Sequence, residues 1–311
     1  MKKIKVAVIG VGNLGQHHAR IYHLMEEVEL VALVDTDIQK LEKFKKIYPD
    51  VKFTTDFQEI LDKIDAASLV VPTRLHYKIA KEILAAKRHL LIEKPITTKI
   101  EEAEELVKIA DENNLILQVG HVERFNPVIF TTKEYVFNPK FIESVRLGNF
   151  DPRVKDVGVV LDLMIHDIDI VLNYVNSKLH SVEAYGAKVF TDKEDIVKAR
   201  LRFQNGTICD LTASRISVYK YRKMHIFQED SYISIDFMRQ QAKIFKKKQK
   251  EVFSPKDIEI IRPKIKKDEP LKLELQHFIN SIIHNKPPEV TAEHAKNALS
   301  VAVEIIEQLK F

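Results

Sequence analysis

The stretch Ile4-Lys5-Val6-Ala7-Val8-Ile9-Gly10-Val11-Gly12-Asn13-Leu14-Gly15 decides the fold of the first part of this chain. Its apolar half reads as a buried strand, and it leads directly into the glycine pattern G-x-G-x-x-G at the start of a helical segment. Asp35 follows about 20 residues after the last of these glycines, at the end of the next predicted strand. This order of strand, glycine turn, helix and acidic residue predicts a dinucleotide-binding unit.

Each glycine of this pattern has a mechanical role. Gly10 permits the tight turn, Gly12 lets a pyrophosphate approach the backbone, and Gly15 lets the helix pack closely on the strand. The N–H groups at the start of the helix then bind the diphosphate. We therefore assign the whole turn to the cofactor site, including Val11, Asn13 and Leu14. A glycine turn that holds no ligand is the alternative.

Asp35 indicates which dinucleotide is bound. Its carboxylate would accept hydrogen bonds from the adenosine ribose hydroxyls and repel a 2′-phosphate, so NAD is favoured over NADP. Lys40, a few residues beyond, keeps NADP open as the alternative. We also assign to the cofactor site three residues that follow the fourth predicted strand, Pro72, Thr73 and His76.

Short apolar runs alternate with amphipathic segments over roughly the first 120 residues, which is the pattern of parallel strands joined by helices. Most runs are continuously apolar, as expected where helices cover both faces of a sheet. We therefore predict an α/β fold with an N-terminal Rossmann-type, doubly wound parallel sheet. Thr98 and Glu101 predict a capping box at the start of the last helix. The strands are predicted at Ile4–Ile9, Leu30–Val34, Lys52–Thr54, Ala67–Val71, His89–Ile92 and Ile116–Val119, and the helices at Leu14–Met25, Ile38–Tyr48, Phe57–Asp62, Tyr77–Ala86 and Ile100–Asn113.

The pattern changes after residue 121, so we predict an NAD-binding domain over 1–121 and a second domain over 122–311. Asn126 is expected to cap a helix that starts at Pro127, and Asn205-Gly206 marks a hairpin turn. The second domain should be α+β, with a large, mostly antiparallel open sheet that has one face free for substrate or a second subunit. The last helix is able to pack back on the first domain. Strands are expected at Ile142–Leu147 and within Val182–Phe245, and helices at Val159–Val175, Leu271–Asn285 and Ala292–Leu309.

Glu93-Lys94-Pro95 directly follows the fifth predicted strand. Ligands of open α/β sheets bind outside the carboxyl ends of the strands, so this tripeptide points to the cofactor crevice. A lysine beside a nicotinamide can hold a substrate hydroxyl and stabilise the alkoxide that forms as hydride leaves. We assign Glu93 and Lys94 to the cofactor site and Lys94 also to catalysis and substrate binding. Pro95 would fix the turn, and a cis bond before it is one way to do so. A surface turn is the alternative.

Asp162 and His166 form a second candidate site within a predicted helix. Residues four apart share one helix face, so the carboxylate and the imidazole project together from apolar surroundings. Histidine is the side chain whose pKa best suits taking and returning a proton near neutral pH. A helix-face pair that only satisfies its own polar groups is the alternative. We expect no metal, because the spacing and number of ligands around His166 do not fit one.

Together and in this order, these motifs resemble the glucose–fructose oxidoreductase/inositol dehydrogenase (Gfo/Idh/MocA) family, and the resemblance covers essentially the whole chain. It rests on the glycine fingerprint, on Glu93-Lys94-Pro95 and on the Asp162/His166 helix. The resemblance implies hydride transfer between NAD and a sugar or polyol carbon. It also implies that Lys94 polarises the reacting hydroxyl, that His166 is the acid/base and that Asp162 positions the substrate. The second-domain sheet often forms the subunit interface in this family, which implies a homodimer or homotetramer.

The stretch Val119–Pro127 looks like the branch of the family that acts on UDP-linked amino sugars, and parts of Ser214–Phe237 add to this likeness. It implies oxidation at C3 of a UDP-N-acetylhexosamine to a 3-keto sugar nucleotide. Arg124 becomes a candidate ligand of the substrate diphosphate or a sugar oxygen, since guanidinium suits bidentate anion binding. A salt bridge that links the domains is the alternative for Arg124. Many relatives carry glycines where this chain has Gln228, Glu229 and Asp230, so we expect a different loop there.

Two other activities and another substrate stay open. The protein could be a non-catalytic NAD sensor that regulates a partner protein, or an enzyme that oxidises and re-reduces its sugar without releasing NADH. A different sugar or polyol is the remaining substrate alternative. Lys94 and His166 favour catalysis, because a sensor does not need them.

The composition, with 45% apolar and 30% charged residues, provides for a sizeable core. No apolar run approaches the roughly 20 residues of a membrane span, and Met-Lys-Lys enters a strand without the apolar core of a signal peptide. The lone cysteine, Cys209, excludes an intramolecular disulfide and fits a reducing compartment, so we expect a cytoplasmic protein. The net charge of +4 comes without a nucleic-acid-binding motif, so we expect neither nucleic acid nor membrane as a partner.

Overall fold

The computed structural model describes residues 3–151, 157–249, 251–252 and 254–311, which form two compact units. The first unit comprises the chain up to His121 together with Leu271–Lys296, and the second comprises Val122–Pro270 together with Asn297–Phe311. The chain enters the second unit at the division that the sequence pattern indicates. Leu271–Lys296, which that pattern assigns to the second domain, clusters instead with the first unit.

Two backbone contacts tie this returning segment to the first unit. The Val119 N–H donates to the Val290 carbonyl at 3.2 Å, and an isolated antiparallel bridge pairs Gln118 with Thr291. Both contacts extend the edge of the first sheet. The sequence pattern of an amphipathic helix shows that the helix has an apolar face, but it does not show which sheet packs against that face.

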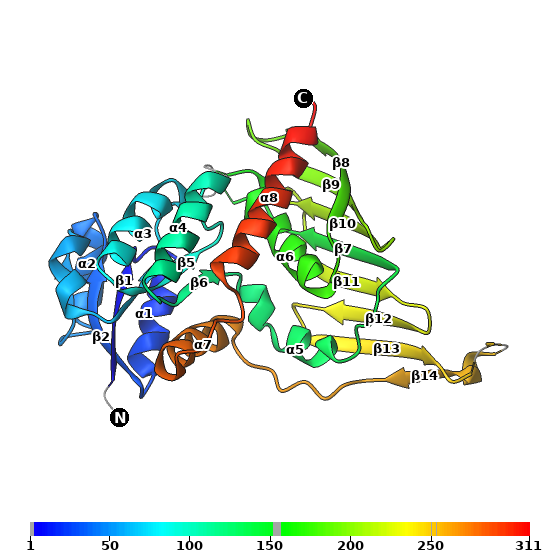
Figure 1. Ribbon diagram of the computed structural model, residues 1–311, viewed down its shortest axis with the longest axis horizontal. Coiled ribbons are helices and arrows are strands. Elements are labelled where there is room, and N and C mark those ends of the chain that lie inside the picture. The colour runs from blue at the N-terminus through cyan, green and yellow to red at the C-terminus, as the bar shows by residue number, and fades with distance from the viewer. Residues whose placement is uncertain (1–2, 152–156, 250, 253) are drawn as a thin grey trace. The chain divides into compact units, whose positions relative to one another are not determined.

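The first unit contains, among its described residues, a six-stranded parallel sheet in the order β3-β2-β1-β4-β5-β6 (Figure 1). The order reverses between β1 and β4, and open α/β sheets bind their ligands at such a point, outside the carboxyl ends of the strands. The predicted doubly wound sheet is confirmed. Its strands are β1 (Ile4–Ile9), β2 (Val28–Val34), β3 (Lys52–Thr54), β4 (Ala66–Leu69), β5 (His89–Glu93) and β6 (Leu117–Gly120).

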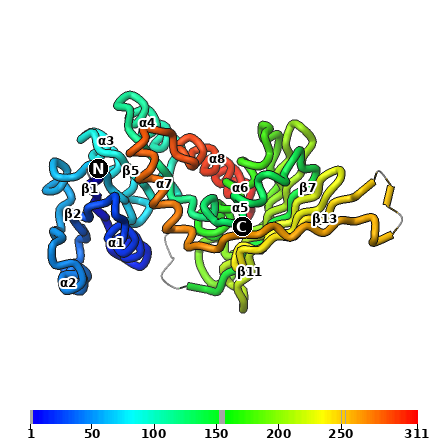
Figure 2. The backbone as a smooth tube through the Cα atoms, turned by 90° about the horizontal axis from the view of Figure 1, so that it is seen from below, coloured from blue at the N-terminus to red at the C-terminus, as the bar shows by residue number. Residues whose placement is uncertain are grey.

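Helices cover both faces of this sheet, with α3 and α4 on one side and α1 and α2 on the other (Figure 2). The segment Phe57–Lys63, predicted as an α-helix, is a 3₁₀ helix, and a second 3₁₀ turn spans Thr73–Leu75. The α-helices are α1 (Gly15–Leu24), α2 (Ile38–Lys45), α3 (His76–Ala85), α4 (Ile100–Glu112) and α7 (Pro270–His284).

The predicted capping box of Thr98 and Glu101 is wrong. The residue before α4 is Lys99, and no side chain caps the helix there. The Thr97 hydroxyl donates to the Lys99 carbonyl at 2.6 Å, and the Thr98 hydroxyl lies 3.4 Å from a Glu102 carboxylate oxygen. Thr97 thus bonds within the turn before α4 and Thr98 bonds a side chain of the helix, so neither hydroxyl caps the helix backbone.

The second unit carries, over its described residues, an eight-stranded sheet in the order β14-β13-β12-β11-β7-β10-β9-β8 (Figure 1). The β7/β10 pair is parallel, and the other pairs in the described sheet are antiparallel, as predicted. The strands are β7 (Phe141–Leu147), β8 (Leu179–Ala187), β9 (Ile196–Phe203), β10 (Ile208–Ser214), β11 (Tyr221–Phe227), β12 (Ser231–Asp236), β13 (Gln241–Lys247) and β14 (Ile258–Ile261).

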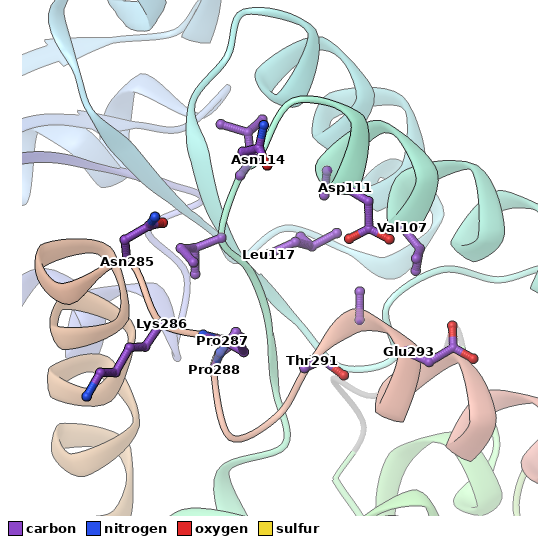
Figure 3. Close-up of a pocket in the computed structure, with 14 residues that line it drawn as sticks. Val107, Asp111, Asn114, Leu117, Asn285, Lys286, Pro287, Pro288, Thr291 and Glu293 are labelled. Atoms are coloured by element: carbon purple, nitrogen blue, oxygen red, sulfur yellow. The ribbon is translucent and has the colours of Figure 1, made fainter.

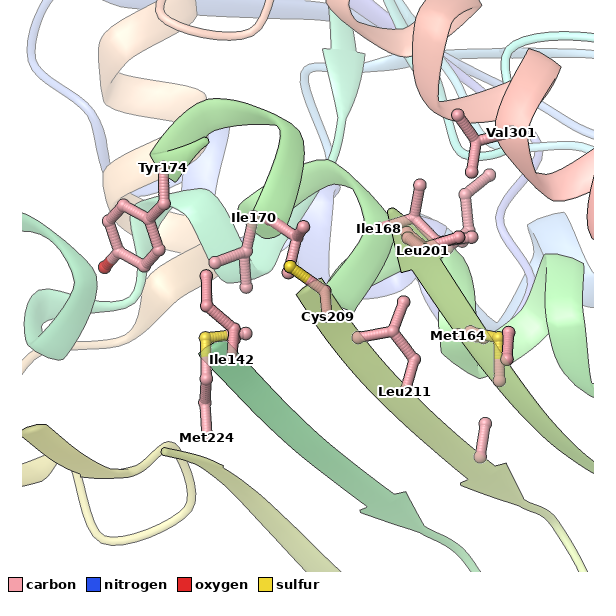
Figure 4. Close-up of a cluster of buried hydrophobic side chains, with 14 of the residues drawn as sticks. Ile142, Met164, Ile168, Ile170, Tyr174, Leu201, Cys209, Leu211, Met224 and Val301 are labelled. Carbon is pink, nitrogen blue, oxygen red and sulfur yellow. The ribbon is translucent and has the colours of Figure 1, made fainter. Parts of the chain in front are cut away.

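One face of this sheet packs against helices to form the core of the second unit. Figure 4 shows Ile168 and Ile170 of a helix over Ile142 and Leu211 of the sheet, with Cys209 among them. Burial raises the pKa of the Cys209 thiol, so it remains a protonated, unreactive packing group. Over the described residues, the helices of this unit are α5 (Pro127–Lys133), α6 (Ile165–Tyr174), the part of α8 (Ala292–Gln308) from Asn297 onward, and shorter turns at Val122–Phe125, Val160–Met164 and Pro255–Asp257. Within the described ranges, no helix combines the length and apolar character that crossing a membrane requires.

Two local predictions in this unit are confirmed. The Asn126 side chain accepts a hydrogen bond from the Val128 N–H, and Pro127 is the first residue of α5. Gly206 has a φ of +86°, and Asn205-Gly206 turns the chain between β9 and β10. Both cases depend on chemistry within four residues, which sequence alone describes well.

The opposite face of the second sheet carries an aromatic row. Successive ring centroids lie 5.7, 4.9 and 5.4 Å apart, and Phe227 is 38% exposed. Each of the four rings is adjacent along its strand to a buried core isoleucine, so alternation places the rings on the face away from the helices. These isoleucines are Ile142, Ile226, Ile233 and Ile244. The aromatic row consists of Phe141, Phe227, Tyr232 and Phe245.

Candidate active site

The glycine turn between β1 and α1 has the geometry that its sequence predicts. Gly10 has a φ of +94°, and a Cβ there would lie 2.3 Å from the Val70 carbonyl oxygen. A Cβ on Gly15 would lie 1.8 Å from the Gly10 carbonyl oxygen, so the start of α1 touches the turn. At Gly12, by contrast, no heavy atom of the described chain lies within 4 Å of such a Cβ. The open space over Gly12 fits the close approach of a dinucleotide diphosphate.

Asp35, at the end of β2, is tied to this turn. Its carboxylate is buried and accepts hydrogen bonds from the Val11 N–H and the Asp37 N–H, each at 3.0 Å. The Lys40 ammonium lies 3.5 Å from the same carboxylate and is about half exposed. Two backbone donors therefore hold the negative charge at the position where this fold places a ribose.

Lys94 follows β5, and its bond to Pro95 is cis. Strand β5 pairs with β4, which pairs with β1, and all three are parallel. Parallel strands end at the same edge of a sheet, so Lys94 lies at the edge that carries the glycine turn. The lysine is half-buried. This is where a group bound outside the carboxyl ends of the strands would meet an ammonium.

The residues after β4 divide into exposed and buried ones. Pro72 is exposed and Thr73 is half-buried. His76 is buried, and its two ring nitrogens lie 2.9 Å from the Pro95 carbonyl oxygen and 2.8 Å from that of Val71. Burial lowers the pKa of His76 and outweighs the two carbonyls. The polar atoms of His76 thus join the end of β4 to the Lys94-Pro95 segment.

The helix predicted over Val159–Val175 begins as a π-helical turn, Val160–Met164, and continues as α6. Asp162 lies in the π turn and is half-buried, and His166 lies in the first turn of α6 and is buried. The helix is confirmed, although its first turn is wider than an α-helical one. Single π turns are frequent at functional sites, because they change where side chains point relative to the rest of the helix.

Glu194 anchors the start of this π turn. The Val159 N–H donates to the Glu194 carbonyl at 3.0 Å, and the Val160 N–H donates to its carboxylate at 3.3 Å. A Cβ on Gly158 would lie 1.9 Å from the same carboxylate. Glu194 thus supplies the acceptors that the first residues of the helix need.

Two buried arginine–aspartate pairs hold α6 next to His166. Arg146 donates through Nε and NH2 to both carboxylate oxygens of Asp167, at 2.9 and 2.8 Å. Arg124 lies 3.4 Å from Asp169. At roughly 100° per residue, positions 167 and 169 lie on opposite sides of position 166 around the helix. The two pairs therefore fix the rotation of the helix that presents His166.

Arg146 also binds Glu123, which is shared with a second arginine. Arg146 donates to a Glu123 carboxylate oxygen at 2.6 Å, and Arg222 donates to the same oxygen at 3.3 Å. Burial alone would raise the pKa of Glu123, but the two guanidinium groups hold it below its usual value. Arg146 is fully buried, and its neighbouring carboxylates raise its pKa despite burial. These charges compensate one another inside the unit.

Arg124 takes part in this internal arrangement. Its side chain is 2% exposed, and its partner Asp169 belongs to the same unit. The salt bridge between Arg124 and Asp169 therefore lies within the second unit. The alternative considered from the sequence was a salt bridge that links the two domains. A contact between Arg124 and a substrate stays a prediction, and this burial does not favour it.

Sequence reasoning misses Arg146, Glu123 and Glu194. A signal for Arg146 exists, because alternation along β7 places it on the same face as Ile142, which lies in the core. A charge at a core position implies a buried partner. Glu123 lies in the stretch that carries the family likeness, but nothing local reveals its partners. Glu194 follows a loop, and its contact with the π turn depends on the tertiary fold.

A surface pocket of about 650 Å³ lies elsewhere in the first unit, at the amino end of β6 (Figure 3). It is formed by the end of α4, the start of β6 and the loop between α7 and α8. Its charged lining groups are Asp111, Lys286 and Glu293. The pocket lies at the opposite end of the strands from the glycine turn, so it is separate from the predicted cofactor site. Over the described ranges, no group of three or more His, Cys, Asp or Glu residues is arranged to hold a metal ion.

Two family models match the chain. The model described as "Oxidoreductase family, NAD-binding Rossmann fold" matches residues 4–121, and the "GFO/IDH/MocA C-terminal domain" matches residues 142–234. The chain belongs to the Gfo/Idh/MocA oxidoreductase family. The resemblance inferred from the motifs is thereby confirmed, and with it an NAD-binding oxidoreductase of the dehydrogenase type.

Named relatives extend over nearly the whole chain. A UDP-N-acetylglucosamine 3-dehydrogenase from Acidithiobacillus ferrooxidans is 32% identical, covering 98% of this chain and 97% of its own. A myo-inositol 2-dehydrogenase from Thermotoga maritima is 25% identical, covering 95% and 93%. A solved structure of the A. ferrooxidans enzyme matches with a TM-score of 0.92 at 30% identity, covering 99% of this chain and 98% of that chain.

Replacing Arg146 by methionine tests the buried charge network. The change leaves the carboxylates of Asp167 and Glu123 without their main partner, and breaking a buried pair costs about 3–5 kcal/mol. We expect a loss of this size in the free energy of unfolding, measured by urea denaturation. Arg202→Met is the matched control, because its pair with Glu183 is exposed and such pairs contribute about 0–1 kcal/mol. Equal losses in the two variants would contradict the assignment.

Proposed function

We propose that this protein is an NAD-dependent dehydrogenase that oxidises C3 of a UDP-N-acetylhexosamine to a 3-keto sugar nucleotide. The observation that carries the proposal is the similarity to a UDP-N-acetylglucosamine 3-dehydrogenase along 98% of this chain. Lys94, Asp162 and His166 stand at the motif positions through which a member of this family would act. The preference for NAD over NADP is supported by the buried Asp35 carboxylate beside the turn.

The proposed role of each side chain follows from its chemistry. The Lys94 ammonium donates a hydrogen bond to the reacting hydroxyl and stabilises the negative charge that develops on its oxygen. His166 accepts the hydroxyl proton, and Asp162 holds a second substrate hydroxyl and orients the sugar. NAD, held over Gly12 when bound, supplies the hydride acceptor. Val11, Asn13, Leu14, Pro72, Thr73, His76 and Glu93 complete the proposed cofactor surroundings.

The direct test mixes the purified protein with NAD and a panel of UDP-sugars and follows absorbance at 340 nm. Formation of NADH with a UDP-N-acetylhexosamine, and a 3-keto product by mass spectrometry, is the expected result. Binding of NAD without turnover of any sugar would contradict the proposal and favour a sensor. Exchange of the C3 hydrogen without net NADH would instead indicate transient oxidation.

Alanine variants of Lys94 and His166 test the catalytic roles. Each should lower kcat by roughly 10²–10⁴, because a positioned charge stabiliser or proton acceptor contributes in this range. NAD binding, followed by fluorescence titration, should remain in the His166 variant. Unchanged turnover in both variants would remove the assignment.

Glycine variants separate the binding role of Gly12 from the packing role of Gly15. Gly12→Ala should leave the melting temperature unchanged and weaken NAD binding, because its Cβ enters open space that the diphosphate needs. Gly15→Ala should lower the melting temperature itself, because its Cβ would meet the Gly10 carbonyl at 1.8 Å. Calorimetry with and without NAD measures both effects. A Gly12 variant that binds NAD as the parent does would contradict the assigned site.

We also propose that the protein is a homo-oligomer that pairs through the open face of its second sheet. The aromatic row lies on this face, and Ile258 and Ile260 of the edge strand β14 are also exposed. Aromatic residues are enriched in the buried centre of protein interfaces, and a two-fold interface uses the same patch on both copies. We further infer a cytoplasmic location, which a lone, reduced cysteine fits.

Phe227→Asp tests this interface. A carboxylate in the aromatic row would be desolvated in the interface, so the variant should be smaller in mass than the parent by sedimentation equilibrium. Leu24→Asp is the control, because Leu24 is 70% exposed on α1 of the first unit. A parent protein that sediments as a monomer would overturn the proposal.

A further inference from the structure

Three ionisable side chains, of which only Glu93 has a role above, come together in the interior of the first unit. Glu274 of α7 and His18 of α1 are both fully buried, and Glu93 at the end of β5 is 7% exposed. The His18 Nε2 atom lies 3.2 Å from a Glu93 carboxylate oxygen. The cluster joins the helix of the glycine fingerprint to the strand end that carries Lys94.

Glu93 is held from several sides. Its Oε1 faces His18, and its Oε2 lies 3.3 Å from the Lys94 N–H, which donates to it. A Cβ on Gly120 of β6 would lie 2.7 Å from the same carboxylate. The carboxylate is therefore folded back against β6, and it connects the backbone of Lys94 with α1. A displacement of Glu93 would displace Lys94 as well.

Glu274 is the second buried carboxyl group of this cluster. Among the described residues, neither of its carboxyl oxygens has a hydrogen-bond partner. Its backbone carbonyl accepts a hydrogen bond from the Gln118 side chain at 3.1 Å, which fixes α7 against β6 at this residue. Burial and the neighbouring Glu93 raise the pKa of Glu274 well above its usual value. A buried carboxyl in such a place avoids the cost of an unpaired charge by keeping its proton.

Among the described residues, the other titratable groups around Glu93 and Glu274 do not provide a cation that pairs with the Glu274 carboxyl group. Tyr22 of α1 faces both carboxyl groups, its hydroxyl is hydrogen-bonded to Ser68 at 2.8 Å, and burial raises its pKa. His76 faces Glu93, and burial lowers its pKa. His18 and the Lys94 backbone complete the Glu93 side. Keeping the proton on Glu274 thus avoids an unpaired buried charge beside the Glu93 carboxyl group.

We propose that Glu274 is a positioning residue for the dehydrogenase reaction proposed above, acting as a protonated carboxylic acid that keeps Glu93, and through it Lys94, in place. The role rests on the proposed function of Lys94. If Glu274 loses its proton as the pH rises, repulsion between the two carboxylates pushes Glu93 away from His18 and Gly120. The basic side of the pH–activity profile therefore reports on Glu274, although Glu274 touches neither substrate nor cofactor.

Glu274→Gln tests the proton without reference to activity. The folded wild type keeps a proton on Glu274 that the unfolded chain releases above its usual pKa of 4.5. Wild-type stability is therefore lost as the pH rises from that value through the raised pKa of the folded state. The glutamine variant, which cannot ionise, should escape this loss, so its advantage in melting temperature should grow with pH. Glu29→Gln, at an exposed position of β2, is the control and should show no such trend. Identical pH dependence in Glu274→Gln and wild type would overturn the proposal.

Turnover tests the positioning role. Glu274→Gln should keep kcat near the wild-type value at neutral pH. On the basic side of the pH profile, its kcat should begin to fall at a higher pH than that of the wild type. Glu274→Leu, which also cannot ionise and removes a carboxyl group that makes no hydrogen bond among the described residues, should show the same raised basic limb. If the basic limb of the glutamine variant is the same as that of the wild type, positioning is refuted. If Glu274→Leu does not fold, the glutamine profile decides.

The stability experiment and the turnover experiment together distinguish a failure of the positioning role from a failure of the proposed function. A wild-type protein that forms no NADH with any nucleotide sugar refutes the proposed function and, with it, the positioning role. The pH dependence of unfolding still shows whether Glu274 carries a proton.

Discussion

The first unit depends on the close approach of α1 to the turn that follows β1. Since a Cβ on Gly15 would lie 1.8 Å from the Gly10 carbonyl, the helix can start at this place only with glycine in its first position. The approach fixes the direction of α1, and one and two turns along it His18 reaches Glu93 and Tyr22 reaches Ser68. The same contact that shapes the proposed diphosphate site thus also aligns the helix with the strand end that carries Lys94.

In the second unit, buried charged side chains fix the orientation of α6. A buried ion pair contributes little net stability, because desolvating two charges offsets most of their attraction, but it is strict about geometry. Arg146 engages both oxygens of Asp167 and one oxygen of Glu123, so few rotations of α6 satisfy it. Glu194 holds the π turn at the other end. Asp162 and His166 are thus presented by a segment that is fixed at its start and along its side.

The sequence predicted the parts of this structure that depend on local chemistry or on periodicity. Continuous apolar runs located the strands of the first sheet, and Asn126-Pro127 and Asn205-Gly206 gave a helix start and a hairpin. The cap at Thr98 failed because α4 begins one residue later, after Lys99, and the hydroxyls of Thr97 and Thr98 bond the Lys99 carbonyl and the Glu102 carboxylate instead. The π turn has no signature in its side chains. The assignment of α7 failed because its apolar stripe fits any sheet. Glu274 does leave a trace, since it lies in that stripe between Leu271 and Phe278, where a carboxyl group is out of place.

The way the chain returns has a consequence for synthesis. Leu271–Lys296 completes the first unit, and the chain then ends in the second, so neither unit is a continuous piece of the polypeptide. Domains of many proteins fold one after the other as they leave the ribosome. Here the amino-terminal sheet must wait, with the edge at β6 uncovered, until the segment up to Lys296 has emerged. The two units therefore mature together, and a fragment that stops at His121 lacks the helix that closes its own core.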